Sequence, residues 1–404
     1  MKVPEIRFEQ YKEPFKHVQL GNLTKKSKIL NKRGQNKNLL SLSYGKIVRK
    51  DIESKKGLLP GSFNSYQIIQ KNSIIFRCTD LQNDKKSLRV GLSMQEGIIS
   101  PAYIRMDCDT TQVLPEYLFN QLHYHDSVTK VYYTMGDGLR QTLSFEDLKE
   151  LDIYLPDFDE QQDIVNYFQL LDDIILFTTK KIEKLKQTKE ASLVAMFPQK
   201  GETKPRVRFK DFKEEWKCVQ LKDISHKVAT KNRDNFYQIT LTNSAEHGIV
   251  NQLDFFDHEV SNNENIVGYY IVDNDDFVYN PRISVTAPVG PINRNKLGYT
   301  GVISPLYYVF KVHDINKDYL SYFFQTTLWH KFMLGNGNSG ARFDRLSIAD
   351  DIFVLMPILM PDSEDEQQEI ANFFSCLDKQ ISLEEQKLEK LKRIKSACLD
   401  KMFI

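Results

Sequence analysis

The sequence has no long apolar run, few cysteines and almost no net charge. None of its 404 residues lies in a stretch that approaches the ~20 apolar residues of a membrane-spanning helix, and the N-terminal MKVPEIRFEQYKEPF lacks the apolar segment of a secretory signal. The five cysteines are widely spread and form no CxxC pair, which argues against a disulfide framework and a zinc site. We therefore expect a cytoplasmic protein without a metal site.

The net charge is only +1, but the basic residues are unevenly distributed. Between Lys25 and Lys56 the chain has eleven Lys or Arg residues and only two acidic residues. A basic run is usually a solvated surface, but here tyrosine, glycine and asparagine are interleaved, as in loops that face phosphates. Composition alone leaves both interpretations open.

The most informative feature of the chain is an internal repeat. Residues 159–197 align with residues 365–403 without a gap, with 20 identities in 39 positions. Shorter matches follow in one order through both halves: 6–20 with 207–221, 66–76 with 269–279, 97–103 with 301–307, 114–122 with 316–324, and 138–144 with 340–347. Residues 22–65 and 222–268 show little similarity. The chain therefore contains two copies of one repeat, and the two copies differ from one another in sequence in their first part.

Each half consists of a short lead-in, a mixed globule and a long helix. Apolar runs at 73–77 and 276–285 predict strands, whereas 115–125 and 317–332 show helical periodicity. In the repeated helix, Asp159 with Gln162 and Asp365 with Gln368 have the spacing of a capping box. An apolar stripe follows each box and needs a partner helix.

We predict an α+β fold with two pseudo-symmetric mixed α/β domains joined by two long antiparallel helices that form a coiled-coil-like spacer. If the repeat closes, the end of the second helix lies beside the lead-in of the first globule. The predicted divisions are 1–156 for the first domain with its lead-in, 157–198 for the first helix, 199–361 for the linker and second domain, and 362–404 for the second helix.

The duplicated pattern resembles the specificity subunit of type I restriction-modification systems. The resemblance covers essentially the whole chain. It rests on the repeated "P…EQQ.I…F…LD..I" helix, the "K.EKLK…K.A…MF" tail, the MFPQKGETKPRVRF bridge and two G[IV]ISPxY strands. Each motif is modest alone, but their duplicated occurrence in one order is specific.

The resemblance implies two target-recognition domains, each reading one part of a bipartite, asymmetric sequence in double-stranded DNA. It further implies helices that fix the gap between the parts and dock two adenine-N6 methyltransferase subunits, which motor-nuclease restriction subunits join. S-adenosylmethionine, ATP and Mg²⁺ would belong to those partners, with no cofactor bound by this chain. At the methyltransferase interface we expect Glu160, Gln161, Glu366 and Gln367, although first-turn residues also favour the helix dipole.

We expect DNA contacts from polar and basic residues in loops and at strand ends, because such side chains pair with base edges and phosphates. The first half supplies Tyr44, Lys46, Arg49, Arg77, Thr79, Gln82, Asn83, Arg89 and Arg140. The second half supplies Arg282, Ser284, Thr286, Asn293, Arg294, Asn295, Lys296, Asn338, Arg342 and Arg345. The glycine-rich segment 335–342 is either a flexible turn or a DNA-contacting loop, and we favour the loop because an arginine recurs there in both halves.

Two other classes remain open: a DNA-modifying enzyme, and a non-catalytic scaffold without sequence specificity. An adenine methyltransferase needs an Asn/Asp-Pro-Pro-Tyr/Phe segment, and the nearest candidate, NPRI at 280–283, lacks the second proline and the aromatic residue. The segments PD at 361–362 and EQK at 385–387 could be parts of a metal-dependent nuclease site, but the first copy has no matching carboxylate. No GxxxxGK[ST] phosphate loop occurs. We predict no catalytic residues on this chain.

Overall fold

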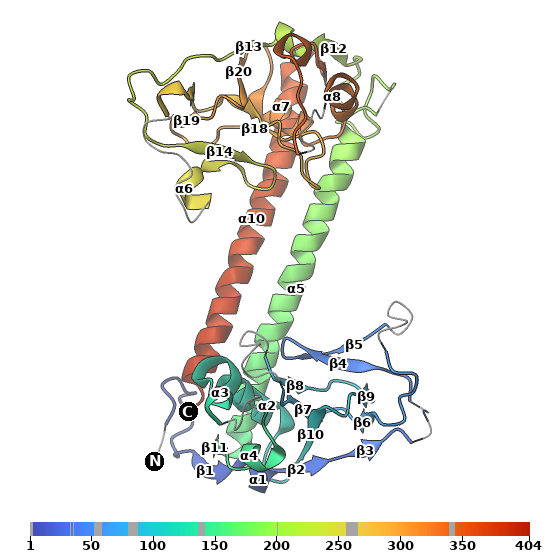
Figure 1. Cartoon of the computed structure of the whole chain (residues 1–404), viewed down its shortest axis with the longest axis vertical. Coiled ribbons are helices and arrows are strands. Elements are labelled where there is room, and N and C mark those ends of the chain that lie inside the picture. Colours follow the sequence, from blue (N-terminus) through green and yellow to red (C-terminus); the bar gives the residue numbers. More distant parts are fainter. Residues whose placement is uncertain are drawn as a thin grey trace. The chain divides into compact units, whose positions relative to one another are not determined.

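The computed structural model describes residues 3–32, 34, 36–51, 59–79, 88–135, 142–199, 201–255, 266–338 and 344–404. The chain forms two compact units: unit 1 is Met1–Thr179 with Gln386–Ile404, and unit 2 is Lys180–Glu385. Two long helices, α5 (Phe158–Met196) and α10 (Glu364–Lys401), are each unbroken and contribute one part to each unit (Figure 1). The α+β class is confirmed. No helix in the described ranges is long and apolar enough to cross a membrane.

Unit 1 is built on a six-stranded sheet of order β2-β10-β7-β8-β5-β4, with a three-stranded sheet β3-β6-β9 and the pair β1-β11. Its strands are β1 (Lys16–Gln19), β2 (Thr24–Ser27), β3 (Ile29–Leu30), β4 (Leu40–Ser43), β5 (Lys46–Arg49), β6 (Gln67–Ile69), β7 (Ile74–Arg77), β8 (Val90–Leu92), β9 (Gly97–Ile99), β10 (Tyr103–Cys108) and β11 (Asp152–Leu155). Its shorter helices are α1 (Leu20–Leu23), α2 (Pro115–Tyr124), the π-helix η2 (His125–Thr129), α3 (Tyr132–Met135) and α4 (Phe145–Leu148).

Unit 2 has a four-stranded sheet of order β13-β20-β17-β18 and the pairs β12-β21, β14-β15 and β16-β19. Its strands are β12 (Lys217–Gln220), β13 (Ser225–Lys227), β14 (Leu241–Ser244), β15 (Gly248–Asn251), β16 (Tyr270–Val272), β17 (Phe277–Tyr279), β18 (Ile292–Arg294), β19 (Gly301–Ile303), β20 (Tyr308–Val312) and β21 (Pro357–Met360). Its shorter helices are η3 (Leu221–Asp223), α6 (Gln252–Phe255), η4 (Ile266–Gly268), α7 (Lys317–Phe323), α8 (His330–Asn336) and α9 (Asp350–Phe353).

The two units repeat one strand plan, including the part where their sequences diverge. The order β2-β10-β7-β8 recurs as β13-β20-β17-β18, and the hairpin β4–β5 corresponds to β14–β15. Before each hairpin an asparagine closes a loop: Asn31 Nδ2 donates to the Asn36 carbonyl at 3.0 Å, and Asn232 Nδ2 donates to the Tyr237 carbonyl at 2.8 Å. Backbone hydrogen bonds and one asparagine fix this loop, so the remaining side chains can differ without changing the fold.

Within each unit, α5 and α10 run antiparallel. In unit 1 the Tyr167 hydroxyl meets Cys398 Sγ at 3.4 Å, and Lys395 pairs with Asp172 further along α5. In unit 2 the direction is the same, with Lys189 paired to Asp378 and Lys181 to Glu384. The first residues of each predicted apolar stripe pack inside a core: Ile164 and Phe168 in unit 1, and Ile370, Phe374 and Leu377 in unit 2.

The repeated Met-Phe pair at the end of each long helix is buried in the core of one unit, and we call it the MF plug. Phe403 packs in unit 1 against Tyr117 and Phe168, with ring centroids 5.6 and 5.8 Å away. Phe197 packs in unit 2 against Tyr319 and Phe374, at 5.5 and 6.2 Å. Just beyond, the Ile6 amide donates to the Lys401 carbonyl at 3.0 Å, and the Val207 amide donates to the Ala195 carbonyl at 2.9 Å. The expected placement of the second helix end beside the first lead-in is therefore confirmed.

A buried ion pair joins each lead-in to the start of a long helix. Arg7 grips Glu160 with two hydrogen bonds of 2.7 Å, and Arg208 grips Glu366 with bonds of 2.6 and 2.8 Å. The glutamate side chains are only 1% and 2% exposed. These hydrogen bonds raise the pKa of both arginines against the opposing effect of burial.

The glutamine that follows each of these glutamates is also hydrogen-bonded within its own unit. Gln161 accepts from the Leu114 amide at 3.0 Å and donates to the Pro156 carbonyl at 3.1 Å. Gln367 repeats this with the Asn316 amide at 2.8 Å and the Pro361 carbonyl at 3.0 Å. The prediction that Glu160, Gln161, Glu366 and Gln367 form a partner interface is therefore wrong, because all four side chains are buried and bonded within the chain.

The predicted capping boxes are also displaced. The helices begin at Phe158 and Glu364, so Asp159 and Asp365 lie inside the first turn. In α10 the cap is Ser363, whose hydroxyl accepts from the Glu366 amide at 3.3 Å. Ser363 lies two residues before Asp365. The sequence did not single it out as the cap, because the acidic residues that follow it also favour the start of a helix.

We predict that Glu366→Ala lowers the stability of unit 2 by about 3 kcal/mol, because it leaves Arg208 buried without a counter-charge. Both tryptophans, Trp216 and Trp329, lie in unit 2, so tryptophan fluorescence during urea unfolding reports on that unit. The matched variant Glu160→Ala removes the equivalent pair of unit 1 and should leave the fluorescence midpoint unchanged. An unchanged midpoint for Glu366→Ala would contradict the assignment.

Candidate nucleic-acid interface

In each unit, the loop after a central strand meets the segment before the last strand. In unit 2 the Ile283 amide donates to the Asp344 carbonyl at 3.0 Å, and the Leu346 amide donates to the Pro281 carbonyl at 2.8 Å. Unit 1 has the same junction, where the Leu143 amide donates to the Cys78 carbonyl at 3.0 Å. Segments some 60 residues apart therefore form one loop pair in each unit.

The loop pair of unit 2 brings predicted DNA-contacting residues together. Arg282 lies opposite Arg345 in an antiparallel bridge, and Asn338 lies opposite Ser347 in another. Arg282 and Asn338 are exposed, and Arg345 is half-buried. Two arginines and an amide on one surface suit contacts with phosphates and base edges. The predicted Arg342 lies outside the described residues, as do Gln82, Asn83 and Arg140 of unit 1.

Residues 280–291, which connect β17 to β18, are held at both ends. Asn280 Nδ2 donates to the Asn243 carbonyl at 2.8 Å, and Asn280 Oδ1 accepts from the Arg282 amide at 3.0 Å. At the other end Gly290 has φ +81°, and a Cβ there would lie 2.0 Å from the Asn280 carbonyl oxygen. Only glycine fits this position, so the loop closes tightly on its own start. Both polar atoms of the Asn280 side chain are therefore used to hold this loop. They are not available for the role that the asparagine of a methyltransferase Asn-Pro-Pro-Tyr/Phe segment has.

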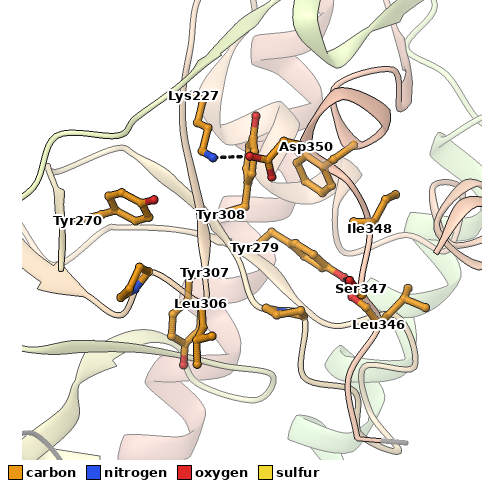
Figure 2. Close-up of a pocket in the computed structure, with 13 residues that line it drawn as sticks. Lys227, Tyr270, Tyr279, Leu306, Tyr307, Tyr308, Leu346, Ser347, Ile348 and Asp350 are labelled. Atoms are coloured by element: carbon orange, nitrogen blue, oxygen red, sulfur yellow. Dashed lines mark hydrogen bonds and ion pairs between the residues drawn. The ribbon is translucent and has the colours of Figure 1, made fainter. Parts of the chain in front are cut away.

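An aromatic pocket of about 240 Å³ supports this loop pair (Figure 2). The Tyr279 hydroxyl, with its single proton, lies 3.0 Å from the Val289 carbonyl oxygen and 3.3 Å from the Leu346 carbonyl oxygen, and so touches both segments of the pair. Figure 2 shows Lys227 directed at Asp350, with which it forms an ion pair. Burial raises the pKa of Tyr279 well above its usual value. The ring therefore acts as a neutral support for the loops.

In unit 1 the hairpin β4–β5 carries exposed basic residues that were predicted to contact DNA. Tyr44 and Gly45 form its turn with φ values of 47° and 76°, and the Tyr44 ring is 71% exposed. Lys46 and Arg49 on β5 are exposed, and Lys50 follows them. Lys46 is next to the turn, whereas Arg49 lies opposite Leu40 at the other end of the hairpin, so an exposed ring and exposed cations are spread along one hairpin and suit a nucleic-acid backbone and its bases.

Arg89 was predicted to contact DNA, and the structure contradicts this. The side chain is 0% exposed; Nη1 donates to the Thr79 carbonyl at 2.7 Å and to the Arg77 carbonyl at 3.4 Å. Its backbone amide donates to Asp126, whose pKa burial raises to about 6. Arg89 is thus a positioning residue that holds the end of β7, including Arg77 and Thr79, against the start of β8.

Asn295 was also predicted to contact DNA, and the structure contradicts this. The neighbouring cations Arg294 and Lys296 are paired within the chain. Asn295 is fully buried and donates to the carbonyls of Asp273 and Tyr299, both at 3.0 Å. Arg294 is only 9% exposed and lies 2.6 Å from Asp318, which also holds Lys296 at 3.0 Å. Burial opposes ionisation of Asp318, but these two cations outweigh it and lower its pKa. The turn after β18 therefore stabilises the fold.

Of the remaining residues of unit 2 that were predicted to contact DNA, some are exposed and one is hydrogen-bonded within the fold. Ser284 and Thr286 are exposed at the tip of the 280–291 loop. Asn293 is half-buried and donates to Asn243 Oδ1 at 2.7 Å. Thr286 and Asn293 both line a hollow of about 510 Å³, which Lys189 of α5 also lines.

The nuclease alternative does not survive the placement of its residues. Asp362 precedes α10 and pairs with Lys217, whereas Glu385 pairs with Lys186 at 2.7 Å. At ~1.5 Å per helical residue, Glu385 lies about 32 Å beyond the start of α10, so the two carboxylates cannot share one metal ion. Within the described ranges, no group of three His, Cys, Asp or Glu side chains could hold a metal ion.

Comparison with known proteins agrees with the duplicated plan. A family model described as the type I restriction modification DNA specificity domain matches residues 12–187 and again residues 213–393. The chain belongs to this family, which confirms the resemblance seen in the sequence and its function in DNA specificity.

Two solved structures have a similar fold. One, the S subunit of a type I restriction-modification system from M. genitalium, is 12% identical with a TM-score of 0.58, and the match covers 100% of this chain and 99% of that chain. The other, from work on complex assembly and conformational transition of the type I R-M system, is 16% identical with a TM-score of 0.53, over 97% and 99% of the two chains.

We predict that replacing Lys46, Arg49 and Lys50 together by glutamine flattens the salt dependence of DNA binding. Each lost phosphate contact lowers the slope of log K against log[salt] by about 0.9, so the slope should fall by about 2 to 3. The matched control replaces Lys204, Arg206 and Lys217 of unit 2, which pair with Glu215, Glu202 and Asp362. An unchanged slope in the first variant would contradict the prediction.

Proposed function

We propose that this chain selects the target of a type I restriction-modification complex by reading double-stranded DNA at two places. Each unit reads one part of a bipartite, asymmetric sequence through its loop pair and hairpin. The observation that carries this proposal is the contrast between a shared framework and unlike exposed residues. Unit 1 exposes Tyr44, Lys46 and Arg49, whereas the corresponding hairpin of unit 2 carries Glu246 and His247 in its turn.

The two long helices set the distance between the two parts of the site. Lead-in contacts, ion pairs and MF plugs anchor each helix at its start in one unit and at its end in the other. Two adenine-N6 methyltransferase subunits dock on the chain, one for each half of the repeat, and motor-nuclease subunits join that complex. Surfaces other than the buried Glu160 and Glu366 regions make these contacts.

The chemistry belongs to the partners. S-adenosylmethionine, ATP and Mg²⁺ are bound by the methyltransferase and restriction subunits, and this chain supplies recognition and geometry without catalytic residues. The commitment of Asn280 to loop closure and the separation of Asp362 from Glu385 support this division.

Co-expression with the cognate methyltransferase and mapping of N6-methyladenine across a genome test the proposal. We expect one bipartite motif with a fixed gap. Methylation at continuous or unrelated sequences would refute bipartite reading, and an absence of sequence preference would favour a plain scaffold. Exchange of residues 22–155 for the same region of another family member should change only one part of the motif.

A further inference from the structure

Val285 stands at the tip of the 280–291 loop and is 102% exposed, more than any other large hydrophobic residue in the described part of the chain. The remaining exposed hydrophobic residues range from 36% to 79%. A singly exposed apolar side chain is common on proteins and needs no explanation by itself. A valine at a turn tip is different, because such positions favour Gly, Asn, Asp or Ser.

The tip is rigid, so this exposure does not come from a loose loop. The Ser284 amide donates to the Ala287 carbonyl at 3.0 Å, and the Ala287 amide donates back to Ser284 Oγ at 3.1 Å. The Gly290 amide also donates to the Ala287 carbonyl at 3.0 Å. Ala287 and Val289 are buried beneath the turn. These bonds hold the isopropyl group of Val285 outward from the unit.

The residues around Val285 are polar. Arg282, Ser284 and Thr286 are exposed on the same loop, and Arg345 lies opposite Arg282. The Ser284 hydroxyl lies 3.2 Å from the Thr286 hydroxyl and holds the turn as well. Val285 is therefore an apolar side chain flanked by exposed polar ones, on a surface whose Arg282, Ser284 and Thr286 suit phosphates and hydrogen-bonding base edges.

In the major groove, the 5-methyl group of thymine is the apolar feature among the base edges. We propose that Val285 contacts the 5-methyl group of a thymine in the part of the site that unit 2 reads, and so contributes to sequence specificity. This inference rests on the proposed function. It requires that the motif contains a T·A pair in that half. Arg282 and Arg345 position the loop on the backbone or on neighbouring bases.

A double-mutant cycle between protein and DNA tests the contact. The complex with the cognate methyltransferase is titrated at fixed salt with a duplex bearing its mapped motif, and each thymine of the half read by unit 2 is replaced in turn by deoxyuridine. At one position the wild type should bind about fourfold more weakly to deoxyuridine, the equivalent of one buried methyl group. Val285→Ala should bind the thymine duplex at least as weakly, with no further loss on deoxyuridine.

Val207→Ala is the matched control, because Val207 is an exposed valine of unit 2 in the lead-in. It should retain the wild-type response to deoxyuridine. Val285→Thr keeps the shape and one methyl group but replaces the other by a hydroxyl, and should show a discrimination between those of the wild type and Val285→Ala. Additive losses in the cycle, or a half-site without thymine, would overturn the inference and leave the proposed function standing. A wild-type complex with no preference for any sequence would instead overturn the proposed function.

Discussion

The buried arginine–glutamate pair at the start of each long helix is the interaction on which the rest of the fold depends. Two charges taken out of water are stabilising only when both oxygens and both donors are matched, and the two-bond geometry of Arg7 with Glu160 and of Arg208 with Glu366 meets this condition. Each pair fixes a lead-in on its helix. The lead-in in turn hydrogen-bonds the end of the other long helix, at the carbonyls of Lys401 and Ala195.

This constraint separates the framework from the candidate nucleic-acid interface. The glutamines beside the ion pairs hold the start of α2 and α7, and the MF plugs fill the cores behind them. None of these residues is free to vary without loss of packing, which is why they recur in both halves. The hairpin and the loop pair are held by backbone bonds and a few side chains, such as Asn280 and Gly290. Their exposed residues can therefore differ between the units at little energetic expense.

The repeat predicted much of the fold, because periodicity and matched order report on burial along whole elements. Strand β9 and its counterpart β19, the two long helices and their antiparallel packing all follow from it. The choice of site residues was weaker, because residue type does not tell which way a side chain points. Arg89 and Asn295 point inward and satisfy backbone carbonyls. Val285 was missed because an apolar residue within a predicted strand, 276–285, is ordinarily assigned to the core.

The candidate interfaces of the two units also differ in how their charges are used. In unit 2, acidic residues around β17 neutralise the cations nearby: Lys311 lies 2.7 Å from Asp273, Lys317 lies 3.2 Å from Asp275, and Asp318 holds Arg294 and Lys296. Cations bonded in this way release few counterions when DNA binds. Unit 1 instead presents its hairpin cations to solvent. General affinity for phosphates should then arise mainly in unit 1, and discrimination in unit 2 should depend on the shape and few side chains of its loop pair. For the bipartite reading proposed above, this division is an advantage, because strong phosphate binding by both units would hold the chain on unrelated DNA.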